Sequence, residues 1–114
     1  MATSKSSSER AELERGLALI DEGAYFEAHE VLEDLWRAAS REERDFFQGL
    51  VHVAVAWHHA GRGNRPGWER QLAKADRRLG PYAPTHRGVD VADLLRQVDE
   101  ASFHGLARVR IKRS

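Results

Sequence analysis

The stretch from Phe46 to Gly61 constrains the fold of this chain more than any other feature, because it contains no Asp, Glu, Lys or Arg. It is shorter than the roughly 20 apolar residues that a membrane-spanning helix needs, and histidines and a glutamine interrupt it. A helix that is apolar on almost every side is normally buried at the centre of a helical protein. The stretch therefore predicts an all-α domain in which other helices surround residues 46–60.

Helical spacing and helix-end signals recur on both sides of this stretch. Ser40 and Glu43 have the spacing of a capping box that would start the central helix, Pro66 suits a first helical turn, and Asp90 can cap the last helix. The fold class that this predicts is all-α, a compact bundle or array of four to five helices with short connections. The predicted helices are residues 8–22, 25–39, 40–60, 66–79 and 90–103.

The ends of the chain differ from its middle in composition. We predict a disordered N-terminal tail at residues 1–8, a single helical domain at 9–104 and a basic C-terminal tail at 105–114. Residues 81–88 are predicted as a loop, and the Val109–Ile111 stretch is the one candidate for strand alternation. The N-terminus lacks the apolar core of a signal peptide, so we expect a cytoplasmic protein.

Composition narrows the classes of function. Lys plus Arg is 18 and Asp plus Glu is 18, a balance that argues against a dedicated nucleic-acid binder and against binding to a membrane surface. The chain has no cysteine, which excludes disulfides and thiolate metal sites. Any chemistry must therefore come from other side chains, of which the six histidines are the most unusual.

Two polar residues interrupt the apolar face of the predicted helix 25–39. At helical spacing His29 lies between Tyr25 and Trp36, and Glu33 lies one turn beyond His29 at the edge of this face. Burying an unpaired polar group costs about 1–3 kcal/mol. We therefore expect a buried pair in which His29 and Glu33 satisfy each other or a third group.

The central helix carries a stripe of polar residues on an otherwise apolar rod, namely Gln48, His52 and His59 in one row with Val55. Facing helices would bring this stripe to His29 and Glu33. We predict a polar pocket between the second and third helices, with aromatic walls. Its candidate members are His29, Glu33, Gln48, His52 and His59, with Tyr25, Trp36 and Trp57 as walls.

At these residues the chain resembles a small bacterial and archaeal family called domain of unknown function 309. The resemblance rests on GAYFEAHEVLEDLWR, ERDFFQGLVHVAVAWHH, a GN loop and GVDVADLLRQV, and covers about residues 13 to 100. Trp68 is a departure, because a small residue is expected after Gly67. The resemblance implies a compact all-α domain and no established reaction. The motif residues map onto His29, Glu33, Trp36, Gln48, Gly49 and Asn64.

Three functional hypotheses follow for this pocket and the basic tail. The leading one is a binding protein that takes a partner or a small ligand through His29, Glu33 and Gln48. The alternative is a metal-dependent or acid/base enzyme, with His29 as base, Glu33 orienting it, and Gln48 or His52 as a polarising donor. The weakest is a nucleic-acid accessory protein that uses Arg108, Arg110, Lys112 and Arg113; a solvated tail is the interpretation that we favour for these residues.

Simpler explanations stay open beside each candidate. His29 and Glu33 can be a hydrogen-bonded pair that only fixes helix packing. Gly63 and Asn64 can form an anion-binding loop before a helix N-terminus, or a plain helix–helix turn. We predict no cofactor; a divalent metal, if bound, would use His29, Glu33 and His52, because His52 and His59 lie about 10 Å apart along the helix axis.

The apolar surface of the central helix also bears on possible partners. The long central helix offers more apolar surface than a small bundle readily covers, which favours self-association as a homodimer. We expect no membrane partner, and no nucleic acid under the leading hypothesis.

Overall fold

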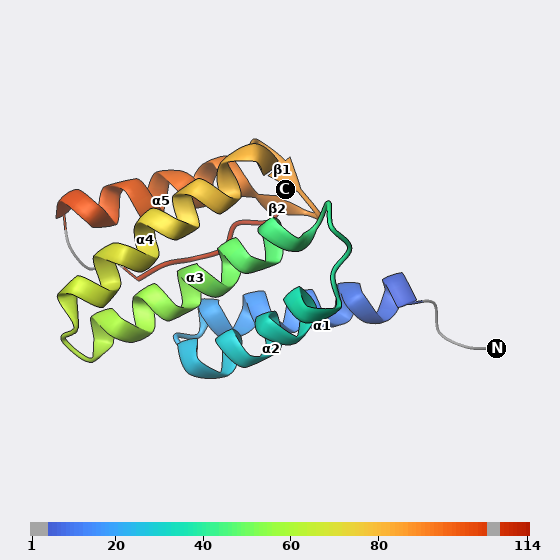
Figure 1. Cartoon of the computed structure of the whole chain (residues 1–114), viewed down its shortest axis with the longest axis horizontal. Helices are drawn as coiled ribbons and strands as arrows, with labels where there is room; N and C mark the ends of the chain where they lie inside the picture. Colours follow the sequence, from blue (N-terminus) through green and yellow to red (C-terminus); the bar gives the residue numbers. More distant parts are fainter. Residues whose placement is uncertain (1–4, 105–107) are drawn as a thin grey trace.

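A computed structural model describes residues 5–104 and 108–114 as an array of five α-helices with a small β-hairpin before the last helix (Figure 1). The predicted all-α fold class is confirmed. No helix of the described residues is both long and apolar enough to cross a membrane. In chain order the elements are α1 (Lys5–Asp21), α2 (Tyr25–Ala38), α3 (Arg44–Gly61), α4 (Arg65–Leu79), the 3₁₀ turn η1 (Gly80–Tyr82), β1 (Thr85–His86), β2 (Val89–Asp90) and α5 (Val91–His104).

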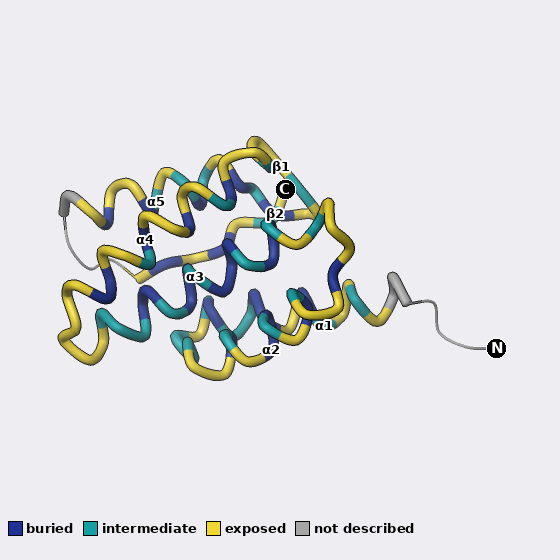
Figure 2. Tube along the Cα trace, in the orientation of Figure 1, coloured by how far each residue is buried: buried dark blue, intermediate teal, exposed yellow. Residues whose placement is uncertain are grey.

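Helix α3 is the centre of the array, as its composition predicts. It lies between α2 and α4 and packs most extensively against these two helices, while α1 packs on α2 and α5 on α4 (Figure 1). Phe46, Phe47 and Leu50 have no exposed surface, and buried residues follow α3 along its length (Figure 2). The core is therefore built around one apolar helix.

Helix α4 packs closely against α3 at Gly49. A Cβ atom at Gly49 would lie 2.5 Å from Cγ of Leu79 and 3.3 Å from Cβ of Arg78. Only glycine leaves room for Leu79 at this crossing. This contact fixes α4 beside the row of polar residues on α3.

Two turns of the same design join α1 to α2 and α3 to α4. Gly23 and Gly63 have φ angles of 82° and 73°. In each turn the glycine N–H donates to the C=O three residues back, and the next N–H donates to the C=O five residues back. This Schellman arrangement ends one helix and lets the next begin within a few residues. Neighbouring helices therefore run antiparallel (Figure 1).

The predicted capping box at Ser40 and Glu43 is wrong. Helix α3 begins at Arg44, and the Glu43 side chain makes no capping hydrogen bond. Its carboxylate instead accepts hydrogen bonds from His86 at 2.8 Å and from Arg87 at 2.5 Å. Hydrogen bonds between charged groups are stronger than a hydrogen bond to a neutral backbone N–H. The Glu43 carboxylate therefore bonds to the hairpin residues and does not cap the helix. By contrast, Pro66 lies in the first turn of α4 and Asp90 accepts from the Asp93 N–H at 2.9 Å, as predicted.

The predicted loop 81–88 contains a hairpin. Strands β1 and β2 pair antiparallel, with His86 opposite Val89. The two turn residues, Arg87 and Gly88, have φ angles of 48° and 77°, which matches a type I′ turn. A positive φ strains arginine, and the ion pair between Arg87 and Glu43 offsets that strain.

The C-terminal residues are not the solvated tail that their charge predicts. Val109 and Ile111 are only 1% and 4% exposed. Residues 108–114 run on the far side of α3, between α1 and α5 (Figure 1). In an extended chain alternate side chains point to opposite faces, so the apolar residues turn inward while Arg110 and Lys112 stay at the surface.

Hydrogen bonds attach this segment to both neighbouring helices. The backbone N–H of Ile111 donates to the Asp21 carboxylate at the end of α1 at 2.7 Å. The backbone N–H of Arg110 donates to the Gln97 side chain of α5 at 3.0 Å. The segment thus fills the gap between the first and last helices.

The N-terminal boundary also differs from the prediction. Helix α1 begins at Lys5, so residues 5–8 of the predicted disordered tail are helical. Residues 1–4 of that tail, and residues 105–107 of the predicted C-terminal tail, lie outside the described part of the chain.

Candidate functional site

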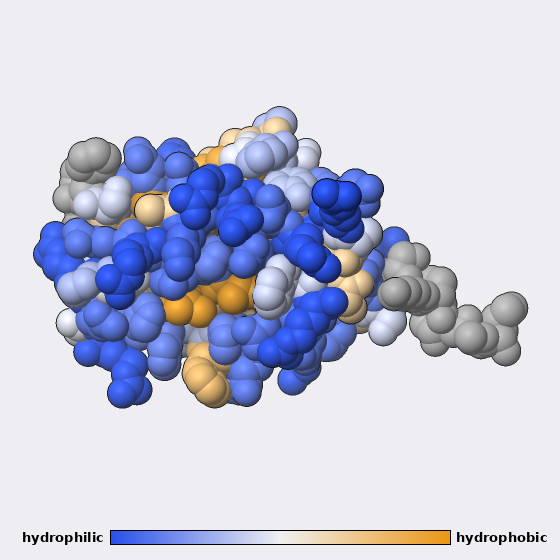
Figure 3. All heavy atoms as spheres, in the orientation of Figure 1, coloured by the Kyte–Doolittle hydropathy of each residue, from blue (hydrophilic) through white to orange (hydrophobic). Residues whose placement is uncertain are grey.

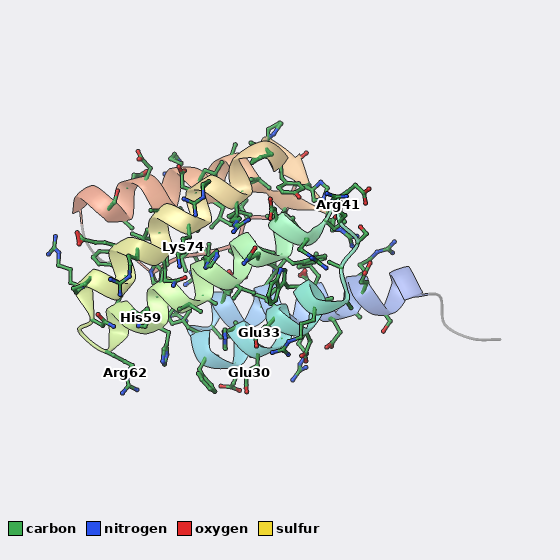
Figure 4. All side chains as sticks on the ribbon, viewed as in Figure 1. Glu30, Glu33, Arg41, His59, Arg62 and Lys74 are labelled. Carbon is green, nitrogen blue, oxygen red and sulfur yellow. The ribbon has the colours of Figure 1, made fainter. Side chains whose placement is uncertain are left out.

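One broad face of the molecule is formed by α2, α3 and α4. Along its middle runs the α3 stripe, which we define as Gln48, Val51, His52, Val55 and His59. Figure 3 shows apolar surface in the centre of this face, with hydrophilic surface on both sides. Figure 4 shows Glu33 of α2, His59 of α3 and Lys74 of α4 on this same face.

The polar members of the stripe are accessible and not buried. Gln48, His52 and His59 are each of intermediate exposure, because their row on α3 faces outward between the two flanking helices. No polar or charged side chain of the described residues is buried. The sequence-based expectation of a buried histidine is therefore wrong: the interior of α3 is wholly apolar, and its polar row lies where α2 and α4 leave it uncovered.

His59 is held by the turn that starts α4. Asn64 caps α4 by accepting from the Gly67 N–H at 3.1 Å, and its amide nitrogen lies 3.2 Å from Nδ1 of His59. A Cβ atom at Gly67 would lie 2.7 Å from the Asn64 amide nitrogen and 3.0 Å from the His59 ring. Glycine at this position leaves room for both side chains.

These contacts define the tautomer of His59. The Asn64 oxygen is already used as the helix cap, so its NH₂ group must donate to His59 Nδ1. The proton of the neutral ring then lies on Nε2, where it is available as a donor. The candidate loop Gly63–Asn64 is thus a helix–helix turn that positions a histidine, and one N–H that an anion would need is already bonded.

His52 is held by α4, and its Nδ1 is a donor where Nδ1 of His59 is an acceptor. Its Nδ1 lies 2.7 Å from Oε1 of Gln71 on α4, so Nδ1 donates and Nε2 remains an acceptor. Burial lowers the pKa of His52; the Gln71 hydrogen bond opposes this, and the nearby charges of Lys74, Arg78 and Arg77 lower it further. The neutral ring is therefore favoured. The α3 stripe thus presents an acceptor at Nε2 of His52 and a donor at Nε2 of His59.

His29 and Glu33 lie on the α2 side of the stripe. His29 Nε2 is 3.5 Å from a Glu33 oxygen, and the two side chains are 25% and 30% exposed. Glu33 also accepts from Arg37 at 2.9 Å. The predicted pair is confirmed as a contact, but Arg37 is its third member and the group is partly open to solvent.

An aromatic cluster continues from His29 toward the end of α3. The Phe26 ring lies 5.8 Å from the His29 ring and 5.7 Å from the His58 ring, and Phe26 is 54% exposed. Beside it is a hollow of about 360 Å³ between the α1–α2 turn and the end of α3. Neither Phe26 nor His58 is predicted as a site residue from the sequence, because a single exposed aromatic side chain has no periodic signal.

The predicted aromatic walls have different positions. Trp57 is 3% exposed and belongs to the core, and Tyr25 lies beside Arg108 of the C-terminal segment. Trp36 is partly buried, and its buried indole N–H has no hydrogen-bond partner among the described residues. Trp68, the departure from the expected small residue, is 7% exposed and packs in the core. Of the three walls, only Trp36 stays a candidate on this face.

The structure therefore divides the predicted pocket into two groups on one face. His29 and Glu33 belong to the α2 edge of the stripe, whereas His52 and His59 are held from α4 and its first turn. The described residues contain no group of three His, Asp or Glu side chains that could hold a metal ion, so His29, Glu33 and His52 are not assembled as a ligand set. The acid/base arrangement would need Gln48 or His52 beside His29, and Nδ1 of His52 instead donates to Gln71 on α4.

Gln71 is the site residue that the sequence analysis missed. It immediately precedes Leu72 at the edge of the apolar face of α4, and it is 19 positions from its partner His52. Helical periodicity describes one helix at a time and carries no information about a contact between two helices. A polar residue at the edge of an apolar face was the only available signal.

The two groups of site residues fall within a segment that matches a known family. The model of the family described as "Domain of unknown function (DUF309)" matches residues 13–71, which is more than half of the chain. The chain belongs to this family. The DUF309 match runs from α1 through Gln71 of α4, and it includes His29, Glu33, the whole α3 stripe and Asn64.

Two relatives have similar sequences over part of their length. "Uncharacterized protein YpuF" of Bacillus subtilis (strain 168) is 36% identical over 67 residues, which are 58% of this chain and 37% of that protein. An "Uncharacterized protein" of Aquifex aeolicus (strain VF5) is 25% identical over 79 residues, or 68% of this chain and 24% of that protein. The chain therefore matches well under half the length of both relatives.

Proposed function

We propose that this DUF309 protein is a binding module, and that a partner or small ligand binds on the face formed by α2, α3 and α4. The observation that carries the proposal is the positioning of His59 by Asn64 and Gly67. The Asn64 side chain caps α4 and orients the His59 imidazole, and Gly67 leaves room for both side chains. The other ring nitrogen remains free for a ligand.

The rest of the face supports the same proposal. His52 presents an acceptor where His59 presents a donor, and Val51 and Val55 lie in the same stripe. A few fixed polar groups on an apolar surface are typical of binding sites, because the apolar area contributes affinity and the polar groups contribute orientation. His29 and Glu33 form the α2 side of this proposed site, and Gln48 is the third polar member of the α3 stripe.

The test follows the imidazole signals of His52 and His59 by NMR during titration with cell extract. The extract is separated into a small-molecule fraction and a protein fraction, and both are added to the untagged protein. We expect one fraction to shift the Nε2 signals of both rings. The double variant His52→Ala/His59→Ala should retain no ligand from that fraction in native mass spectrometry.

The double variant Arg96→Ala/Glu100→Ala serves as control, because these exposed residues lie on α5, away from the face. It should retain the ligand like the wild type. If neither fraction shifts either ring, the proposal is wrong. If His52→Ala/His59→Ala does not fold, Gln48→Ala provides the same comparison with a milder change.

A further inference from the structure

The two helices that flank the α3 stripe carry opposite charge. Helix α2 has four acidic residues and one arginine, whereas α4 has five basic residues and two acidic ones. The two acidic residues of α4, Glu69 and Asp76, line the groove toward α5. The basic residues Lys74, Arg77 and Arg78 are close enough to His52 of the α3 stripe to influence its protonation. The face is therefore acidic along one edge and basic along the other.

Much of this charge has no partner within the described chain. Glu30 on α2 and Arg70, Lys74 and Arg77 on α4 make no ion pair with any described residue, although many other charged side chains do. Figure 4 shows Glu30 and Lys74 on opposite sides of α3. The α2 edge therefore presents unpaired acidic side chains and the α4 edge presents unpaired basic ones. A partner that carries one basic edge and one acidic edge, at the same spacing, would complement both.

A second copy of this chain is such a partner. We infer that two copies bind face to face, with the α3 stripes in contact and α2 of each copy over α4 of the other. A two-fold axis parallel to α3 exchanges the two edges, so the acidic edge of each copy meets the basic edge of the other twice. This inference rests on the proposed function, since it names the partner of the same face.

The charge pattern selects this orientation over the alternative. A two-fold axis across α3 would place α2 over α2 and α4 over α4, so that like charges would meet at both edges. With the axis along α3, Val51 and Val55 meet their own counterparts and the apolar centre is covered. This apolar area is small, so the charged edges contribute much of the specificity, and the dimer should weaken as salt screens them.

The experiment is sedimentation velocity of the full chain over a range of concentrations, at about 0.05 M and about 0.5 M salt. We expect a dimer that forms as concentration rises and is at least about tenfold weaker at the higher salt. The variant Glu30→Lys/Glu33→Lys makes both edges basic, and Arg70→Glu/Lys74→Glu makes both edges acidic. Each variant alone should be a monomer.

Mixing the two variants gives the decisive result. In an equal mixture the basic edges of one variant face the acidic edges of the other, so a heterodimer should form although neither variant associates alone. The control variant Asp76→Lys/Asp99→Lys makes a similar charge change in the groove between α4 and α5, and it should dimerise like the wild type. Circular dichroism of each variant establishes that it is folded.

Several outcomes would overturn the inference. They are a wild type that stays monomeric at every concentration in low salt, charge variants that dimerise like the wild type, or a mixture of the variants that stays monomeric. Its failure is separable from that of the proposed function. A monomeric protein whose His52 and His59 signals still shift with a fraction of the extract would keep its binding face and lose only the second copy as partner.

Discussion

At the scale of single residues, glycines decide what can come close to the site. Gly67 leaves space for Asn64 and His59, and Gly49 leaves space for Leu79 at the crossing of α3 and α4. Gly61 lies in the same helix as Gly49, and a Cβ atom there would meet nothing within 4 Å. Substitution of alanine at Gly49 and at Gly61 therefore distinguishes the steric requirement for glycine from the lower helix propensity of glycine.

We expect Gly49→Ala to destabilise the protein by about 1–3 kcal/mol, because the new methyl group collides with Leu79 in a packed core. Gly61→Ala should be neutral or stabilising by up to about 1 kcal/mol, because alanine favours helix and has open space there. Urea unfolding followed by circular dichroism measures both free energies. Equal effects of the two substitutions would contradict the packing at Gly49.

At the scale of elements, the C-terminal segment is part of the core. It hydrogen bonds to α1 and α5, and the Asp90 N–H at the start of α5 donates to the Lys112 carbonyl. Its basic side chains are partly engaged as well, since Arg113 pairs with Glu14. The nucleic-acid hypothesis, which is untested, would rest mainly on the more exposed Arg110 and Lys112.

Alanine substitutions at alternate positions of this segment should have different effects on the free energy of unfolding. Val109→Ala/Ile111→Ala should lower the free energy of unfolding by about 3–5 kcal/mol, because both side chains are buried. Arg110→Ala/Lys112→Ala is the matched control, and its effect should stay within about 0.5 kcal/mol. Thermal and urea unfolding give both values. A tail that contributes nothing to stability would leave the two double variants alike.

At the scale of the whole molecule, ionisable groups link distant elements and make stability depend on pH. Burial raises the pKa of Glu43, but the hydrogen bonds from Arg87 and His86 outweigh it and leave the pKa lowered. This cluster joins the start of α3 to the hairpin. His52, with its lowered pKa, joins the middle of α3 to α4.

Lowering the pH should therefore reduce the free energy of unfolding in two stages. In the unfolded chain His52 takes up a proton near its ordinary pKa of 6.5, whereas the folded protein resists it, so stability falls as the pH drops below that value. Glu43 stabilises the folded state above its ordinary pKa of 4.5, and that contribution disappears as the pH falls through its lowered pKa.

Urea unfolding at a series of pH values measures both stages. His52→Gln should reduce the stage that begins just below pH 6.5 and leave the lower one unchanged, whereas Glu43→Gln should reduce the lower stage and leave the upper one unchanged. His58, whose pKa burial and the nearby Arg62 charge also lower, contributes to the upper stage with the same sign. A wild-type stability that does not change from neutral pH down to pH 4.5 would contradict the assignment of His52.

The helical class, the central position of α3, most helix ends and the row of Gln48, His52 and His59 could all be predicted from the amino-acid sequence. Those features follow from the spacing of apolar residues and from local end signals, which act within one helix. Other features could be seen only in the tertiary structure. The polar row is open to solvent, and Gln71 and Asn64 hydrogen bond to its histidines. The Glu43 carboxylate bonds to Arg87 and does not cap α3, and Val109 and Ile111 are buried in the core. The rotation of one helix against another, and the contacts between residues far apart in the chain, depend on how all the apolar faces pack together.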